Sequence, residues 1–300
     1  VPREQLESTL PTIEEALELY LSVKGHSKGK LFFSHAKRNI SYLVSCLGSR
    51  PLDCYSTADA AEFRQWLVDK GLGNTSLQRI FGVVKAVVNF TIKEQGLDCK
   101  NAFAGVYLPS EINKKRLPIK EAKLKLLQKE CIHLDDDIRW LVALISDTGM
   151  RLSEAVGLLV DDLVIDAQRP YVNLIAHPHR RLKTDSSERV IPLVGSSLWA
   201  AQRIKQTQNA SFSFERYCDT DNCNSNSASA AINKWIKTIA GTEAVIHGFR
   251  HGFRDRLRAV EAPVDMIDQL GGWSLRSVGQ GYGDGYPLNL LHRWMERIVI

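Results

Sequence analysis

The stretch from Val245 to Tyr282 decides how the chain is interpreted, and it reads VIHGFRHGFRDRLRAVEAPVDMIDQLGGWSLRSVGQGY. It begins as a basic helical run with His247 and Arg250, turns at two successive glycines, and continues through Trp273. Arginine presents five donors in a planar fork and stays protonated, which suits it to phosphate oxygens. A tyrosine hydroxyl can attack phosphorus and leave a covalent intermediate. These groups, so close together, indicate a site for a charged transition state.

The composition of the whole chain limits the classes of protein to consider. A chain of 300 residues is expected to form two domains, and its hydrophobic content of 44% can supply their cores. The net charge of +5 permits a nucleic-acid partner without requiring one. We find neither an apolar run near the ~20 residues that span a bilayer nor a signal peptide. We therefore expect a cytoplasmic protein without a membrane partner. The first residue is Val1, which leaves room for an upstream segment.

The chain offers no convincing metal site. Its six cysteines are scattered, so we expect free thiols in a reducing compartment. Cys218 and Cys223 could share a metal, but no second ligand pair stands at zinc spacing. His177 and His179 lack a carboxylate or cysteine at a fixed spacing, so we interpret them as loop residues. The sequence therefore predicts neither a metal nor another cofactor.

Residues 12–97 carry the apolar periodicity of helices. Thr12 and Glu15 form a capping box before the first helix. Further helices are expected over 30–47, over 57–70 and from about residue 74. The second and fourth present polar faces of basic and amide residues, which can reach phosphates and base edges. The candidate DNA contacts on these faces are Lys30, Lys37, Arg38, Gln78, Lys85 and Asn89. Ordinary solvated faces remain the alternative, because basic residues barely outnumber acidic ones here.

A polar stretch with two prolines and a basic triplet, residues 107–118, marks a domain boundary. We expect a helical DNA-binding domain over 1–106, a linker over 107–118 and a second domain over 119–300. Lys114, Lys115 and Arg116 could lie along a DNA backbone, although linkers are also basic for solubility.

The second domain combines helices with three short β-like runs. Helices are expected over 119–130, over 135–147 and from near Arg151, where Glu154 can brace the arginine from the same face. An ordinary surface ion pair is the alternative. The runs 163–165, 171–175 and 189–193 fit a small antiparallel sheet with Lys183 between the last two. A polar loop is expected over 222–229, before a helix over 230–240. The fold class is mainly α with a small antiparallel β-sheet: a helical domain followed by an α+β domain.

Five motifs in order resemble the tyrosine recombinase (phage integrase) family. They are Thr148-Gly-Met-Arg151-Leu-Ser-Glu154, Lys183 before Arg189-Val-Ile-Pro-Leu193, His247-x-x-Arg250-His251, Leu270-Gly-Gly-Trp273, and Tyr282. Each motif is weak by itself, but five in register are specific. The resemblance covers about residues 110–290, and the helical N-terminal region resembles the family's core-binding (SAM-like) domain.

The motif His-Gly-Phe-Arg occurs twice in tandem, at 247–250 and 251–254. The family places a second histidine directly after its arginine, and His251 supplies it for Arg250, whereas Asp255 follows Arg254. We therefore assign His247 and Arg250 to the site. Arg254 is left as a phosphate contact or a surface ion pair.

The resemblance implies a catalytic set and a mechanism. The residues it assigns to catalysis are Arg151, Lys183, His247, Arg250, Trp273 and Tyr282, with Glu154 and His251 in support. Tyr282 would attack a DNA phosphodiester, form a 3′-phosphotyrosine and release a 5′-hydroxyl, without metal or ATP. Lys183 would protonate the leaving oxygen while the arginines hold the non-bridging oxygens. Trp273 departs from the commoner histidine, and its indole N–H can donate a hydrogen bond but cannot transfer a proton.

Tyr286 competes with Tyr282 as the nucleophile. Tyr282 keeps the family's nine-residue spacing from Trp273, so we assign it. Glycines alternate around it at 279, 281, 283 and 285, and each costs a helix about 1 kcal/mol relative to alanine. We therefore expect a loosely held tyrosine segment.

The implied partners are double-stranded DNA recombination sites, three further copies in a homotetramer, and DNA-bending or directionality accessory proteins. A prokaryotic host would add association with the nucleoid. Two alternatives are a type IB topoisomerase-like enzyme, which only nicks and reseals, and a non-catalytic DNA-binding protein. The complete catalytic set argues against the second. The apolar stripe of Leu288–Ile300 suits packing on a neighbouring subunit and argues against the first, although packing on its own domain explains it equally well.

Overall fold

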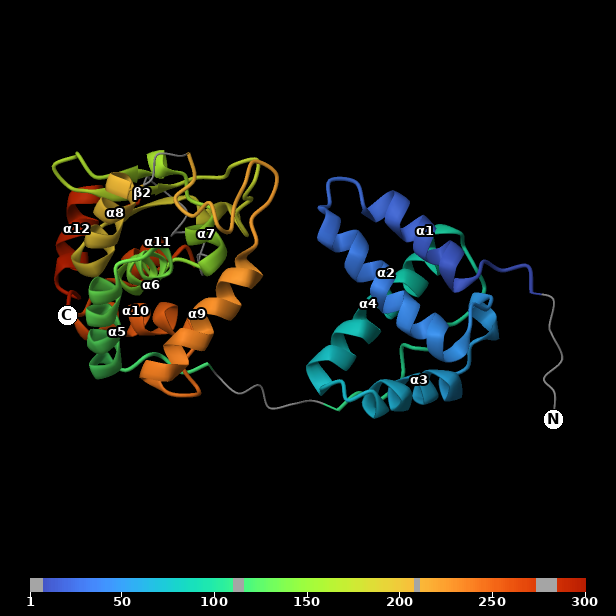
Figure 1. Cartoon of the computed structure of the whole chain (residues 1–300). Coiled ribbons are helices and arrows are strands. Elements are labelled where there is room, and N and C mark those ends of the chain that lie inside the picture. The colour runs from blue at the N-terminus through green and yellow to red at the C-terminus, as the bar shows by residue number, and fades with distance from the viewer. Residues whose placement is uncertain (1–7, 110–115, 208–210, 274–284) are drawn as a thin grey trace. The chain divides into compact units, whose positions relative to one another are not determined.

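The computed structural model describes residues 8–109, 116–207, 211–273 and 285–300 (Figure 1). The chain divides into two compact units, Val1–Lys114 and Lys115–Ile300, each with its own hydrophobic core. Among the described residues, we find no helix with the length and apolarity of a membrane span.

The described residues of the first unit form a bundle of four α-helices. They are α1 (Ile13–Lys24), α2 (Lys30–Leu47), α3 (Thr57–Asp69) and α4 (Asn74–Glu94). Thr12 and Glu15 form the capping box predicted for α1, and Ser56 and Asp59 form another at α3. The predicted apolar stripe of α4 is buried against the other helices, because its members recur every three or four residues.

The segment after α4 folds back onto the first unit. Phe103 and Val106 are buried in its core. The Nδ2 atom of Asn101 donates to Asn89 Oδ1 at 2.8 Å, and the Nε2 atom of Gln78 donates to Pro109 O at 3.2 Å. The amides of Gln78 and Asn89, which the sequence offers for DNA contacts, therefore already bond to the protein's own chain.

The second unit packs its helices around α6. The helices are α5 (Glu121–Leu134), α6 (Asp137–Thr148), α7 (Leu152–Val156), α8 (Gly195–Thr207), α9 (Ser225–Ala240), α10 (His247–Ala259), α11 (Val264–Gly271) and α12 (Leu288–Glu296). Every residue from Trp140 to Thr148 is buried, since α6 crosses the middle of the unit with helices around it (Figure 1). The last turn of α6 leads directly into the Thr148-Gly149-Met150-Arg151 turn.

A three-stranded antiparallel sheet lies along one edge of this unit (Figure 1). Its strands are β1 (Leu163–Val164), β2 (Tyr171–Leu174) and β3 (Arg189–Pro192), in the order β1-β2-β3. Val172 pairs with Ile191, and both side chains are buried. The predicted fold class, mainly helical with a small antiparallel sheet, is confirmed.

The predicted loop over 222–229 is too long, because only residues 222–224 precede the helix and α9 begins at Ser225. The side chain of Asn224 accepts the amide N–H of Ser227 at 3.1 Å and caps the helix. Ala228 is fully buried in the first turn. A segment rich in serine and asparagine thus becomes helical once a cap and a buried alanine anchor it.

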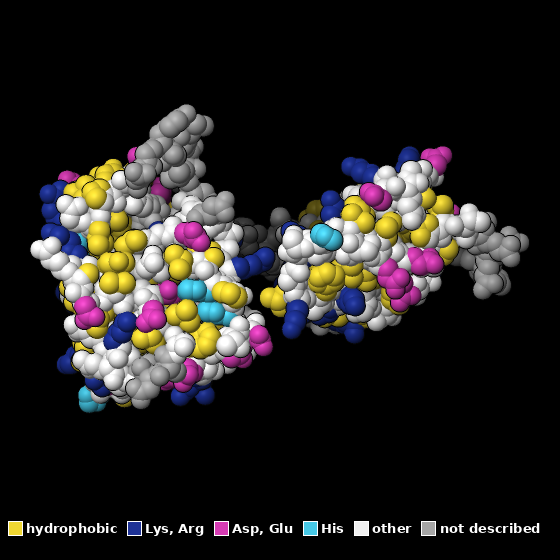
Figure 2. All heavy atoms as spheres, turned by 90° about the horizontal axis from the view of Figure 1, so that it is seen from above, with side chains coloured by type: hydrophobic (Ala, Val, Ile, Leu, Met, Phe, Trp, Pro, Cys, Tyr) yellow, Lys and Arg dark blue, Asp and Glu magenta, His cyan; other side chains and the backbone are white. Residues whose placement is uncertain are grey.

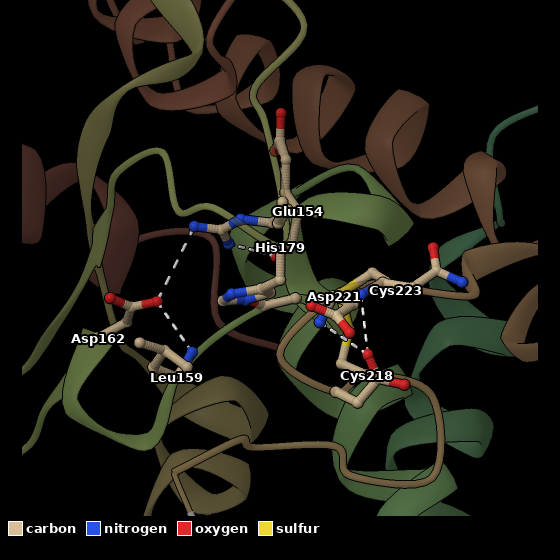
Figure 3. Close-up of a disulfide and its surroundings, with 11 residues drawn as sticks. Glu154, Leu159, Asp162, His179, Cys218, Asp221 and Cys223 are labelled. Carbon is tan, nitrogen blue, oxygen red and sulfur yellow. Dashed lines mark hydrogen bonds and ion pairs between the residues drawn. A yellow bond between two sulfur atoms is a disulfide. The ribbon is translucent and has the colours of Figure 1, made fainter. Parts of the chain in front are cut away.

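The expectation of free thiols throughout is also wrong. Cys218 and Cys223 form a disulfide at the base of a short loop (Figure 3). The loop doubles back, with the amide N–H of Asp219 donating to Asn222 O at 3.0 Å, and this brings the two Cα atoms within 4.3 Å. The sequence shows only a separation of five residues, not the reversal of the chain. The remaining four cysteines are free.

The apolar stripe near the C-terminus packs on its own unit. Leu291, Met295 and Ile298 are buried in the core of the second unit. In this structure the stripe is explained by packing within the chain, which was the alternative to packing on a neighbour.

Candidate active site

Arg151 stands at the junction of α6 and α7. Gly149 ends α6 in the left-handed conformation, with φ 62°, and a Cβ atom there would lie 2.5 Å from the ring of Phe253. The turn places the Arg151 guanidinium against two further elements. Its Nη1 donates to Ser187 Oγ at 3.2 Å, and its Nη2 donates to Gly272 O at 3.2 Å.

Glu154 holds two arginines with one carboxylate. Its side chain is only 4% exposed; Oε1 pairs with Arg151, and Oε2 lies 3.0 Å from Arg189 Nη2. Burial opposes ionisation, but the charge of Arg189 and hydrogen bonds from both arginines outweigh it and lower the pKa of Glu154. The pair is therefore internal rather than an ordinary surface pair.

Arg189 is not among the residues predicted for the site. Its side chain is 3% exposed, and besides Glu154 it donates through Nε to Leu270 O at 2.9 Å. It thereby joins β3 to the Leu-Gly-Gly-Trp turn. The sequence signal for it is an arginine that opens a strand before Val190-Ile-Pro-Leu193.

The tandem repeat of α10 places each residue type on its own side of the helix, because four residues make about one turn. Phe249 and Phe253 enter the core. The rings of His247 and His251 meet edge to face, with centroids 5.1 Å apart. A Cβ atom at Gly248 would lie 2.8 Å from Leu117 O, so the glycine lets the end of the linker lie against the helix.

Arg250 and Arg254, the two arginines of the tandem repeat, differ in their counter-ions. Arg254 Nη2 lies 2.9 Å from Asp268 Oδ1. Arg250, only 4% exposed, donates through Nη1 to Gly149 O at 2.7 Å, and within the described residues its buried Nη2 has no hydrogen-bond partner. Burial, then the charges of Arg151 and Arg189, lower the pKa of Arg250 to about 9. It still carries its charge at neutral pH, so Arg250 could hold an anion.

The Leu-Gly-Gly-Trp turn needs both of its glycines. Gly272 caps α11 in the left-handed conformation, with φ 59°, and a Cβ atom there would lie 2.6 Å from Arg189 Nη1. A Cβ atom at Gly271 would overlap the Trp273 ring. Trp273 therefore folds back over the turn, and its ring lies beside Arg250, whose guanidinium carbon is 4.4 Å from the ring centroid.

His247 is neutral at physiological pH. Burial is the largest cause, followed by the positive potential of His251 and Arg116, and together they lower the pKa of His247 to about 4. A neutral imidazole can accept a proton or a hydrogen bond, as a base for a tyrosine hydroxyl must.

The His247→Gln substitution is expected to flatten the dependence of stability on pH between 6.5 and 4. Because the folded-state pKa lies below that of an unfolded histidine, the unfolded state binds more protons in this window. The wild-type free energy of unfolding should therefore fall as the pH is lowered through it. Urea unfolding at half-unit intervals measures both slopes. Equal slopes for wild type and variant would refute the low pKa.

The remaining predicted residues are distributed as follows. Lys183 is exposed in the loop between β2 and β3. Arg180 ties this loop to α7, since its Nη1 donates to Glu154 O at 2.7 Å.

Arg116 lines an open cavity of about 680 Å³ together with His247 and His251. On α2, Lys30, Lys37 and Arg38 are exposed, whereas Lys85 on α4 is half-buried. Tyr282, Lys114 and Lys115 lie outside the described residues, as does most of the glycine-rich tyrosine segment.

Two further observations concern metals and surface charge. His177 Nε2 lies 3.0 Å from the Asp162 carboxylate, a partner that its loop position did not indicate. Asp162 also caps the turn after α7 by accepting the amide N–H of Leu159 at 3.0 Å (Figure 3). Within the described ranges, no three His, Cys, Asp or Glu side chains are grouped to hold a metal ion.

On the face drawn in Figure 2, basic side chains are interspersed with acidic and apolar ones, so charge there does not by itself mark a DNA surface.

The fold agrees with the comparisons to known proteins. The model of the phage integrase family matches residues 119–286, more than half of the chain, and the chain therefore belongs to this family. It is a site-specific DNA recombinase, an enzyme that cleaves and rejoins DNA strands. The recombinase prediction is confirmed, and the two alternatives are not favoured.

Solved integrases bound to DNA share the fold. The integrase of transposon Tn1549 in complex with transposon right-end DNA has a TM-score of 0.67 and 19% identity, covering 96% of this chain and 99% of that one. A lambda integrase dimer on a COC′ core site has a TM-score of 0.66 and 15% identity, covering 92% and 98%. A lambda integrase tetramer on a Holliday junction gives 0.65 and 14%, covering 92% and 78%. No curated protein matches the sequence.

Proposed function

We propose that the protein recombines double-stranded DNA sites through a covalent 3′-phosphotyrosine formed by Tyr282. The observation that carries this proposal is the placement of Arg151 and Arg250 at one turn, because Arg250 donates to Gly149 O while Arg151 follows two residues later. Arg250 also keeps a buried Nη2 without a partner among the described residues. A buried donor without an acceptor is costly, and a phosphate oxygen would satisfy it.

The roles follow from the chemistry of each side chain. Arg151 and Arg250 stabilise the charge that develops on the non-bridging oxygens. His247, neutral at pH 7, accepts the proton of the Tyr282 hydroxyl. Lys183 protonates the 5′-oxygen that leaves. The energy of the broken phosphodiester is kept in the phosphotyrosine, so a 5′-hydroxyl of the partner duplex can reverse the step.

The first unit is proposed as the core-binding domain and residues 119–300 as the catalytic domain. The exposed Lys30, Lys37 and Arg38 and the linker residues Lys114, Lys115 and Arg116 contact the DNA backbone in this proposal. The lambda integrase with the same fold was solved as a tetramer on a Holliday junction, which supports a homotetramer for this chain. Accessory proteins that bend DNA or set direction, and association with the nucleoid in a prokaryotic host, complete the proposal.

Replacement of Lys183 by alanine tests the proposed mechanism. The variant is expected to cleave a normal phosphodiester about 10²–10⁴-fold more slowly, the usual contribution of a general acid, while DNA affinity stays nearly unchanged. A substrate with a 5′-thiolate leaving group hardly needs a proton, so it should restore most of the rate. Single-turnover cleavage of both substrates, followed by denaturing electrophoresis, measures this.

Arg181 is a suitable control for the lysine variant, since it is an exposed cation in the same loop. The cleavage rate of Arg181→Ala relative to the wild type should be the same for the normal and the 5′-thiolate substrate. If the thiolate gave Lys183→Ala no selective rescue, another group would be the acid.

A further inference from the structure

The ring of Trp273 is contacted by two arginines, and one of them is held by a buried aspartate. We call this group of Trp273, Arg250, Arg254 and Asp268 the indole clamp. The guanidinium carbon of Arg250 lies 4.4 Å from the centroid of the Trp273 ring, and that of Arg254 lies 4.5 Å from it. Guanidinium groups at this distance are attracted to the negative face of an indole. Two arginines, one helical turn apart on α10, therefore hold a single ring.

Asp268 fixes both the ring and the second arginine. It lies on α11, its side chain is 1% exposed, and its carboxylate accepts Arg254 Nη2 at 2.9 Å. Its backbone carbonyl accepts the amide N–H of Trp273 at 3.0 Å. Among the described residues, its buried Oδ2 has no hydrogen bond, so Arg254 supplies the positive charge next to this carboxylate.

The two arginines have different tasks in this arrangement. Arg254 is neutralised by Asp268, whereas Arg250 pairs with no carboxylate in the described part of the chain. Arg254 therefore has little reason to bind phosphate itself. Its planar guanidinium covers the same ring that Arg250 covers, so it can act on Arg250 through the ring.

We propose that Arg254 is a positioning residue for strand cleavage. With Asp268 it fixes the Trp273 ring, and the ring sets the plane of the Arg250 guanidinium for the scissile phosphate. This inference rests on the proposed phosphate-binding function of Arg250. Lysine at position 254 would keep the ion pair with Asp268 but lose the planar group that stacks on the ring.

A purely structural pair between α10 and α11 would behave differently from a positioning pair. It would lower stability, and its effect on cleavage would multiply with that of any other substitution. A residue that acts through the ring has no further effect once the ring is absent, because interacting residues are not additive.

The test is a double-substitution cycle on the full chain, with Arg254→Lys, Trp273→Leu and both together. Single-turnover cleavage of a nicked duplex with a 5′-thiolate leaving group is measured at saturating DNA, so that slow variants stay measurable. Arg254→Lys should slow cleavage by up to about 10²-fold, the cost of a misplaced catalytic group, with unchanged DNA affinity. Adding Arg254→Lys to Trp273→Leu should slow it no further. Multiplying losses, or an unchanged rate for Arg254→Lys, would overturn the inference.

Three further variants separate the outcomes. Arg258→Lys alters an exposed pair with Asp255 on the same helix and should leave the rate unchanged. Arg254→Gln with Asp268→Asn keeps a neutral hydrogen-bonded pair, leaves no buried charge unpaired, and should slow cleavage like Arg254→Lys. Arg250→Lys reports on the proposed function itself: full activity there would refute phosphate binding by Arg250, independently of the clamp.

Discussion

The Tyr282→Phe variant is expected to form no covalent adduct with DNA, while its affinity for the duplex stays unchanged. Phenylalanine differs only by the hydroxyl that attacks phosphorus, so the loss should be complete rather than partial. The measurement uses a duplex with a nick near the cleavage site, which traps the adduct when the short 5′-hydroxyl strand diffuses away. Denaturing electrophoresis then shows a protein band that carries labelled DNA.

Tyr286→Phe is the matched control, and the structure gives a reason to expect that it keeps the adduct. The backbone of Tyr286 is held on both sides by Gln269, which accepts its N–H at 2.8 Å and donates to its carbonyl at 3.1 Å. Its ring is half-buried against the core of the second unit. An adduct with Tyr282→Phe and none with Tyr286→Phe would reverse the assignment of the nucleophile.

The Glu154→Gln substitution should give the largest loss of stability among single changes at the site. It would leave Arg189, with 3% of its side chain exposed, without a carboxylate. Breaking a buried pair from one side costs about 3–5 kcal/mol, because a charge is left uncompensated. Urea unfolding followed by circular dichroism measures the change in the free energy of unfolding.

Asp255→Asn provides the comparison for Glu154→Gln. Asp255 pairs with Arg258 at 3.3 Å, and more than half of both side chains is exposed. Exposed pairs contribute about 0–1 kcal/mol, so this variant should unfold nearly like the wild type. Similar losses for the two variants would mean that Glu154 does not organise the arginines as its burial indicates.

The helices and strands followed from local patterns in the sequence. The capping box at Thr12 predicted where α1 begins. Apolar residues at helical spacing, followed by the glycine at position 48, predicted both ends of α2. The strands around Lys183 were found because turn residues separate three short β-like runs. Such signals act between residues that are close along the chain, so a single sequence contains them.

The contacts that complete the site are long-range, and the sequence did not contain them. Glu154 and Arg189 lie 35 residues apart, and Arg256 reaches across 109 residues to the buried Asp147. The sequence leaves Arg254 open between a phosphate contact and a surface pair, because no motif marks Asp268. The disulfide between Cys218 and Cys223 is a local contact over five residues, and the sequence did not show the reversal of the chain that brings the two cysteines together.

The carboxylate that Arg151 and Arg189 share has a consequence for how the site would distinguish a bound intact DNA strand from the transition state of its cleavage. The carboxylate of Glu154 pairs with Arg151 and Arg189, whereas Arg250 pairs with no carboxylate among the described residues, so positive charge is in excess over negative charge around these arginines. An intact phosphodiester brings one negative charge, and further charge develops on the oxygens during phosphoryl transfer. In the proposed mechanism, this excess of positive charge favours the transition state over the bound intact strand, which is the condition for speeding a reaction without trapping its substrate.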